Sequence, residues 1–247
     1  MEVLSFNLSG KFAFFKNESI NNIYDTYPHI HKPALLGLFG AILGYDGYAQ
    51  TQKFFDKKDN IYPEYYKKLK DLKIAIVPKK ANFSKILETF TNNTGMFNKE
   101  GASLVTQEFW LENPSWDIYL VIDDEESKKI KDSILNSKSV YSIYLGSNHH
   151  FANISNIGIF EARELKFSAD VIHSLIKVED VDINFDNMLT TRKENKNLYY
   201  FNYTLPTVLT ENTNLYKKEK FILTNDLLNF KKLKGYYKVD NFNIVFY

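Results

Sequence analysis

Basic and imidazole side chains gather just before a predicted helix, where they could bind an anion. Pro33 is a favoured first residue of a helix. The first turn of a helix presents free backbone N–H groups and positive potential to a phosphate. Two lysines that follow the first predicted strand could neutralise further phosphates. The candidate phosphate-binding residues in this part of the chain are Lys11, Lys16, His29, His31 and Lys32.

A long polar stretch from residue 79 to residue 104 contains a second set of candidates. Its lysines could neutralise phosphates, and its larger apolar side chains could wedge beside a base. A turn further along the chain could meet nucleotide edges or backbone. Each of these side chains could equally be an ordinary solvated or packed residue. The candidates are Lys79, Lys80, Phe83, Lys85, Met96, Phe97 and Lys99 in the polar stretch, and Asn148, His149 and His150 in the turn.

Other kinds of chemistry find less support in the sequence. The histidine pairs at 29/31 and 149/150 suggest zinc, but neither pair has a nearby carboxylate in helical register. The chain has no cysteine, which excludes thiolate ligands and thiol catalysis. No Ser-His-Asp arrangement and no phosphate-binding glycine loop is present. We therefore expect no metal, no cofactor and no catalytic residue.

The composition places limits on how the chain could bind a polyanion. The net charge is only +1, so attraction depends on local segregation of charge. Lysines concentrate in residues 53–73 and 215–238, whereas residues 108–126 contain no lysine or arginine. Arg163 and Arg192 are the only arginines, which argues against dense bidentate recognition of guanine. The 17 Tyr and 20 Phe could fill a core or stack on bases.

The hydrophobic pattern predicts the elements that position these residues. We expect a strand at 3–9, a helix from Pro33 to Gly44, a helix at 62–72, strands at 73–77 and 116–122, a helix from about 125 to 138 and a strand at 139–145. This order is that of a ferredoxin-like, α+β fold, with the helices on one face of the sheet and the other face exposed. The exposed face would be a platform for nucleic acid.

We divide the chain into two predicted domains. Residues 1–154 form the ferredoxin-like domain, with an insertion at about 79–115, and residues 155–247 form a β-rich lobe. The N-terminus lacks a signal-peptide pattern, and the longest apolar helix-like run, from Ala34 to Leu43, is too short to cross a bilayer. We expect a cytoplasmic protein without a membrane partner.

Four segments in order resemble the Cas-five family of CRISPR-associated proteins, within the RAMP superfamily and most similar to its type I-B branch. They are residues 6–13, 27–44, 107–114 and 144–148. The resemblance implies an RRM-like palm with a protruding thumb hairpin at the polar insertion. It also implies a subunit of the Cascade complex that holds the five-prime handle of the crRNA, and the candidate phosphate- and base-binding residues would then contact this RNA.

The same resemblance implies the partners of the chain. They are the Cas-seven backbone, the large Cas-eight subunit and the target DNA near the protospacer-adjacent motif, with the guide selecting the target by base pairing.

Two other functions stay open. Some type I-C relatives are metal-independent endoribonucleases that process pre-crRNA with Tyr, Lys and His, and Tyr45, Tyr48 and His31 offer such residue types here. A purely structural subunit would contact only proteins.

Overall fold

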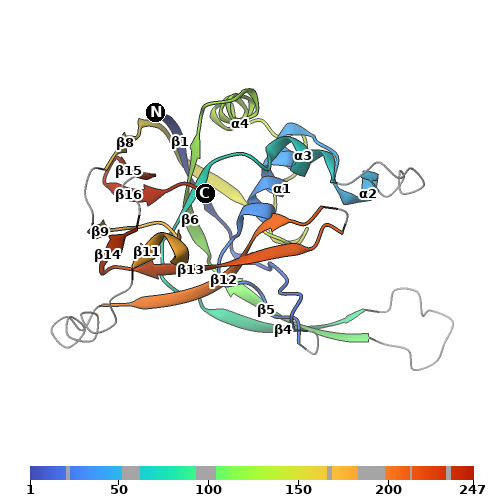
Figure 1. Ribbon diagram of the computed structural model, residues 1–247. Helices are drawn as coiled ribbons and strands as arrows, with labels where there is room; N and C mark the ends of the chain where they lie inside the picture. The colour runs from blue at the N-terminus through green and yellow to red at the C-terminus, as the bar shows by residue number, and fades with distance from the viewer. Residues whose placement is uncertain are drawn as a thin grey trace, which may run out of the picture.

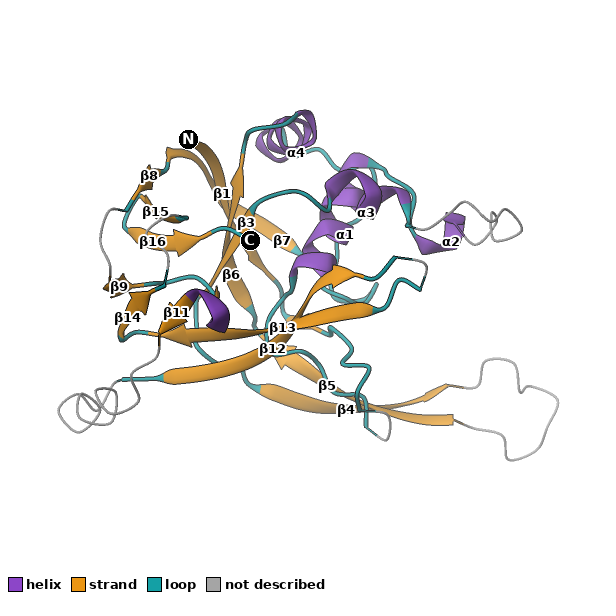
Figure 2. Ribbon diagram, viewed as in Figure 1, coloured by secondary structure: helices purple, strands orange, loops and turns teal. Residues whose placement is uncertain are grey.

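The computed structural model describes eight parts of the chain, which together form a mixed α+β structure with mostly antiparallel sheets (Figures 1 and 2). The described residues are 1–20, 23–51, 62–92, 104–165, 169–182, 198–211, 213–231 and 235–247. The predicted α+β class is confirmed. Among the described helices, none is long and apolar enough to cross a membrane.

A four-stranded antiparallel sheet lies at the centre of the molecule. Its strands are β3 (Ile74–Pro78), β6 (Ser115–Val121), β1 (Glu2–Ser9) and β7 (Asn153–Glu161), in that order. Successive side chains of a strand point to opposite faces. Leu4, Phe6 and Leu8 of β1 therefore share one face, where they belong to the main hydrophobic core.

Helices cover this face of the sheet (Figure 2). Three of them were predicted, namely α1 (Lys32–Leu43), α3 (Glu64–Leu69) and α4 (Glu125–Leu135). The fourth is the short helix α2 (Tyr48–Thr51). Pro33 lies in the first turn of α1, and Gly44 ends the helix with a φ of 77°. The carboxylate of Asp124 accepts the backbone N–H of Ser127 at 2.7 Å and so caps α4.

The opposite face of the sheet is not the open platform that the sequence suggested. Val3, Val77 and Tyr119 on this face pack in a second hydrophobic cluster with Val239 and Ile244. The last two residues belong to a hairpin of β15 (Tyr236–Val239) and β16 (Phe242–Val245) near the C-terminus. This part of the prediction is wrong, because residues with alternating polar and apolar character can also be buried under a distant segment of the same chain.

The described residues after 161 are rich in strands, as predicted for 155–247. The predicted boundary at 154 falls inside β7, which pairs with β1. A sheet of β10, β13 and β12 packs Leu205 and Phe221 into the main core. The elements are β8 (Arg163–Glu164), β9 (Ala169–Val171), β10 (Ile176–Lys177), η2 (Val178–Asp180), β11 (Val181–Asp182), β12 (Tyr200–Leu209), β13 (Tyr216–Thr224) and β14 (Leu227–Phe230).

A two-stranded hairpin projects from the body of the molecule within the predicted insertion (Figure 1). It consists of β4 (Lys85–Asn92) and β5 (Leu104–Glu112), and β2 (Phe12–Ala13) pairs with the base of β5.

The strand predicted at 139–145 is absent, and the fourth strand of the sheet is β7 instead. The backbone N–H groups of Val140 and Tyr141 donate to the carbonyl oxygens of Ile42 and Ala41, each at 3.1 Å. Those oxygens lie in the last turn of α1 and lack partners within the helix. The apolar segment therefore completes the end of a helix and does not pair with a strand.

Candidate nucleic-acid interface

Segments that are far apart in the sequence meet at the base of the β4–β5 hairpin. The backbone N–H of Phe14 donates to the carbonyl of Leu145 at 3.0 Å, and that of Gly10 donates to Pro114 at 3.2 Å. The rings of Trp110 and His150 are 4.4 Å apart. All four segments that resemble the Cas-five family contribute residues here or to the adjoining pocket.

One pocket with a volume of about 660 Å³ lies between α1 and the segment 141–146. We call it the tyrosine pocket, because six tyrosines line it. They are Tyr45, Tyr48, Tyr65, Tyr141, Tyr144 and Tyr216. Ala34, Gly37 and Ala41 of α1 also line the pocket, together with the larger Pro33 and Leu38.

The pocket is aromatic and carries little charge. Lys16 is exposed at its edge, with its Nζ 3.6 Å from the ring centroid of Tyr24 at the hairpin base. Burial raises the pKa of Tyr216 to about 12 and also raises that of Tyr65, so both hydroxyls stay neutral near pH 7. Side chains of Tyr141 and Tyr144 are about half exposed, at 52% and 45%. Such rings can stack on bases while a lysine neutralises a phosphate.

A second aromatic group lies beside the turn at 147–150. We call Phe12, Trp110, His149 and His150 the Trp110 cluster. The ring of Trp110 lies 5.7 Å from that of Phe12 and 5.5 Å from that of His149. The indole N–H of Trp110 donates to Glu108 Oε2 at 2.7 Å. Lys11 is exposed beside the cluster, 5.3 Å from the ring centroid of Phe12.

Three of the predicted binding residues lie in the core instead of on the surface. His29, His31 and Phe83 are only 0%, 2% and 3% exposed. The side chain of His31 caps α1, since its Nδ1 accepts the backbone N–H of Ala34 at 3.3 Å. Burial lowers the pKa of both histidines to about 3, so they are neutral near pH 7. We therefore withdraw all three from the proposed interface.

The start of α1 is not an open phosphate site either. Lys32 is half-buried, its Nζ donates to the carbonyl of Tyr247 at 3.0 Å, and burial lowers its pKa to about 8. The predicted site fails because His31 already satisfies an N–H of the first turn and the final strand region covers Lys32. Sequence could not show this, since Lys32 and Tyr247 lie at opposite ends of the chain.

The predicted lysines fall into two groups. Lys79 pairs with Asp117, and Lys85 pairs with Asp25 at 2.7 Å. Lys11, Lys16 and Lys80 are exposed and have no ion pair with any residue in the described ranges. Asn148 and His149 are exposed and His150 is buried. Met96, Phe97 and Lys99 lie outside the described residues.

The described strands of the hairpin carry more acidic than basic side chains. Lys85 is their one lysine, against Glu88, Glu108 and Glu112. Leu87, Phe90 and Val105 are exposed there.

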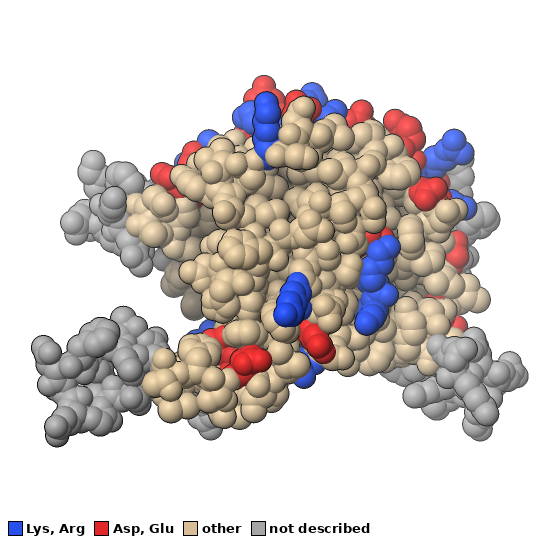
Figure 3. Space-filling model, turned by 180° about the vertical axis from the view of Figure 1, so that it is seen from behind, with Lys and Arg blue, Asp and Glu red and all other residues tan. Residues whose placement is uncertain are grey.

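Seen from behind, a broad uncharged area occupies the upper middle of the molecule (Figure 3). Phosphate contact therefore depends on a few lysines near the hairpin base, and not on a wide basic surface.

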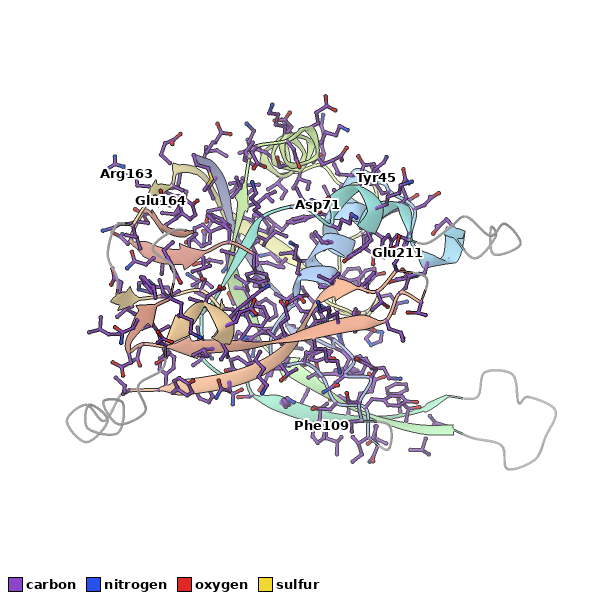
Figure 4. The ribbon with its side chains drawn as sticks, viewed as in Figure 1. Tyr45, Asp71, Phe109, Arg163, Glu164 and Glu211 are labelled. Carbon is purple, nitrogen blue, oxygen red and sulfur yellow. The ribbon has the colours of Figure 1, made fainter. Side chains whose placement is uncertain are left out.

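Four residues of the candidate site were not predicted from the sequence: Tyr141, Tyr144, Tyr216 and Trp110. No local signal in the sequence marks these four residues. Tyr216, for example, reaches the pocket on β13, which lies near the other end of the chain. Tyr45 was considered for catalysis. Its hydroxyl donates to Glu126 at 2.5 Å, and Lys68 lies 3.9 Å from its ring centroid. Figure 4 shows Tyr45 among the helices and Phe109 on the separate hairpin.

Comparison with known proteins gives a fold but no sequence family. No protein-family model and no curated protein matches the chain. A chain from a CRISPR RNA-guided surveillance complex is 14% identical with a TM-score of 0.53, and the match covers 94% of this chain and 92% of that chain. A CRISPR protein from Archaeoglobus fulgidus is 10% identical with a TM-score of 0.50, and the match covers 99% of both chains. The chain thus shares its fold with CRISPR-associated proteins.

Proposed function

We propose that this chain is a CRISPR-associated RNA-binding subunit of a type I-B Cascade surveillance complex, similar to the Cas-five family and acting in the cytoplasm. In this role it holds the five-prime handle of the crRNA. The observation that carries the proposal is the tyrosine pocket with Lys16 at its edge, located at the base of a projecting hairpin. The shared fold with CRISPR-associated proteins supports it.

The chemistry of the pocket suits a single-stranded RNA. Stacking of a base on an aromatic side chain contributes about 1–3 kcal/mol, and it tolerates any sequence because every base has a π-face. Lys11, Lys16 and Lys80 can each neutralise one phosphate. With few such contacts, affinity should depend on stacking more than on charge. This favours a short, ordered segment such as a handle over a long duplex.

The strand order β3-β6-β1-β7 supports a ferredoxin-like palm, with the β4–β5 hairpin as its thumb. We propose that the exposed apolar side chains of the hairpin contact neighbouring subunits of the complex. A Cas-seven backbone and a Cas-eight large subunit are the partners that this function requires. Target DNA near the protospacer-adjacent motif would then approach the chain only within the assembled complex.

We further propose that the chain is not the nuclease of its system. A metal-independent ribonuclease needs a base near the ribose hydroxyl with a pKa close to the working pH. His31 is buried with a pKa lowered to about 3, and its Nδ1 already accepts a helix N–H. The hydroxyl of Tyr45 is engaged by Glu126. Neither group is therefore prepared for proton transfer.

The test is binding of the purified chain to labelled crRNA-repeat RNA, followed by fluorescence anisotropy and by gel electrophoresis. Replacing both Tyr141 and Tyr144 by Ala should weaken binding about tenfold or more, since each lost stack costs about 1–3 kcal/mol. Leu227→Ala, at an exposed apolar side chain on β14, is the control and should leave binding unchanged. Equal binding by the double variant would contradict the proposal. Specific cleavage that Tyr45→Phe abolishes would favour the nuclease.

A further inference from the structure

The imidazole of His150 is buried without a hydrogen-bond partner. Its side chain is 3% exposed, and among the described residues neither Nδ1 nor Nε2 finds a partner. Burial and the neighbouring His149 lower the pKa of His150 to about 4, so the ring is neutral near pH 7. A neutral imidazole carries one donor and one acceptor. Burying a hydrogen-bond donor and an acceptor without partners costs free energy of folding. Unpaired buried polar groups in native proteins therefore call for an explanation, such as a functional role.

The backbone holds this ring in place. The N–H of His150 donates to the carbonyl of Ser147 at 3.0 Å, and its carbonyl accepts the N–H of Leu145 at 2.7 Å. The ring contacts are aromatic, with Trp110 at 4.4 Å and Phe12 at 6.2 Å between centroids. Trp110 has a single N–H donor, which Glu108 already accepts. The rings around His150 therefore provide stacking surfaces but leave its nitrogens unpaired.

His149 covers this arrangement from the solvent side. It is exposed, and its ring lies 4.5 Å from that of His150 and 5.5 Å from that of Trp110. Within the described ranges, its hydrogen bonds go to Ser147 Oγ and Asn148 Oδ1 of the same short turn. Exposed side chains change rotamer on the nanosecond scale. A rotation of His149 would give a planar ligand access to Trp110 and His150 together.

We propose that the Trp110 cluster reads one base of the bound RNA, with the base stacked on Trp110 in place of His149 and its polar edge hydrogen-bonded to His150. This inference rests on the proposed function and adds base selectivity to it. A base edge offers donors and acceptors that a neutral imidazole can match. Lys11 beside Phe12 is placed to neutralise an adjoining phosphate. The tyrosine pocket, on the other side of the turn, would hold a base without selecting it.

The experiment compares RNA selection by the full chain and by His150→Phe, which keeps an aromatic ring and removes both nitrogens. A pool of short single-stranded RNAs, randomised at every position, is bound, recovered and sequenced. The wild-type protein should prefer one base at one position by about tenfold, as expected for the loss of a buried hydrogen bond. His150→Phe should lose that preference and bind non-preferred RNAs with unchanged affinity. Leu227→Ala, at an exposed apolar side chain on β14, is the control and should keep the preference.

Thermal melting separates this role from a structural one. Because His150→Phe removes unpaired polar atoms, its melting temperature should equal or exceed that of the wild type, and His150→Leu gives a second variant without ring nitrogens. Absence of any RNA binding by the wild-type protein would overturn the proposed function itself. Binding without a preferred base, or a preference that both His150 variants retain, would overturn only the base-reading role.

Discussion

Gly146 lies directly against the backbone of Phe14: an ideal Cβ on Gly146 would be 1.9 Å from the carbonyl oxygen of Phe14. Gly146 also has a φ of 84°, which side chains of L-residues rarely allow. The contact fixes the turn between the tyrosine pocket and the Trp110 cluster. Both candidate sites therefore depend on the absence of a side chain at one position.

Gly146→Ala should destabilise the fold strongly, because the new methyl group meets a backbone oxygen that cannot move aside. We expect a loss of more than about 2 kcal/mol in the free energy of unfolding, measured by urea denaturation. Gly235→Ala is the matched control, since Gly235 has a φ of 96° but nothing within 4 Å of its Cβ position. It should cost about 1 kcal/mol from strain alone. Equal losses would show that the contact with Phe14 is unimportant.

Two glycines of α1 should respond in opposite directions to replacement by alanine. A Cβ on Gly40 would lie 2.5 Å from Cβ of Tyr65 on α3, whereas one on Gly37 would lie 3.9 Å from the nearest atom of that ring. Alanine favours a helix interior by about 1 kcal/mol over glycine. Gly37→Ala should therefore be neutral or stabilising, and Gly40→Ala destabilising, in thermal melting. The account of α1–α3 packing is wrong if Gly40→Ala raises the melting temperature.

Stability should fall as the pH is lowered from about 6.5 to about 5. Burial lowers the pKa of His29 and His31 to about 3 and contributes to lowering that of His150 to about 4, so the unfolded chain binds protons in this range that the native chain does not. The loss should approach 1.4 kcal/mol per pH unit for each histidine. Urea denaturation at several pH values in this range measures the loss in the free energy of unfolding. His31→Asn keeps a capping oxygen and should make the free energy of unfolding depend less steeply on pH. A flat profile would contradict the burial of these rings.

Lys16 and Lys79 should contribute to different properties. Lys16→Met should weaken RNA binding and reduce the dependence of log affinity on log salt by about one, because one phosphate contact is lost. Lys79 instead pairs with Asp117, whose side chain is mostly buried and also accepts from Asn7 at 3.0 Å. Lys79→Met should leave RNA affinity unchanged and cost at most about 1 kcal/mol of stability, since the lysine is half exposed. The reverse pattern would remove Lys16 from the interface.

Local patterns in the sequence predicted most individual elements. Pro33 and Gly44 mark the two ends of the first predicted helix through their own backbone chemistry, and the structure confirms both. The alternation in β1 also predicted a strand correctly. Its second face was assigned to solvent because the sequence of one strand does not show what covers it. The β15–β16 hairpin comes from more than 200 residues away.

The candidate site was predicted less well, for a related reason. His29 and His31 have the residue type of a phosphate ligand, but their burial depends on aromatic neighbours from distant segments, including Tyr203 and Tyr216. The sequence predicted a turn at 148–150, and the structure has a turn there. It could not show that His150 points inward against Trp110 while His149 points outward.

Ultraviolet crosslinking of the purified chain to single-stranded crRNA-repeat RNA, followed by mass spectrometry of the joined peptides, locates the bound RNA on the protein. We expect crosslinks at Tyr141, Tyr144 and Trp110, whose rings lie on either side of the turn at the hairpin base. Crosslinks confined to the β15–β16 hairpin and β14, with none in the tyrosine pocket or the Trp110 cluster, would contradict the proposed interface.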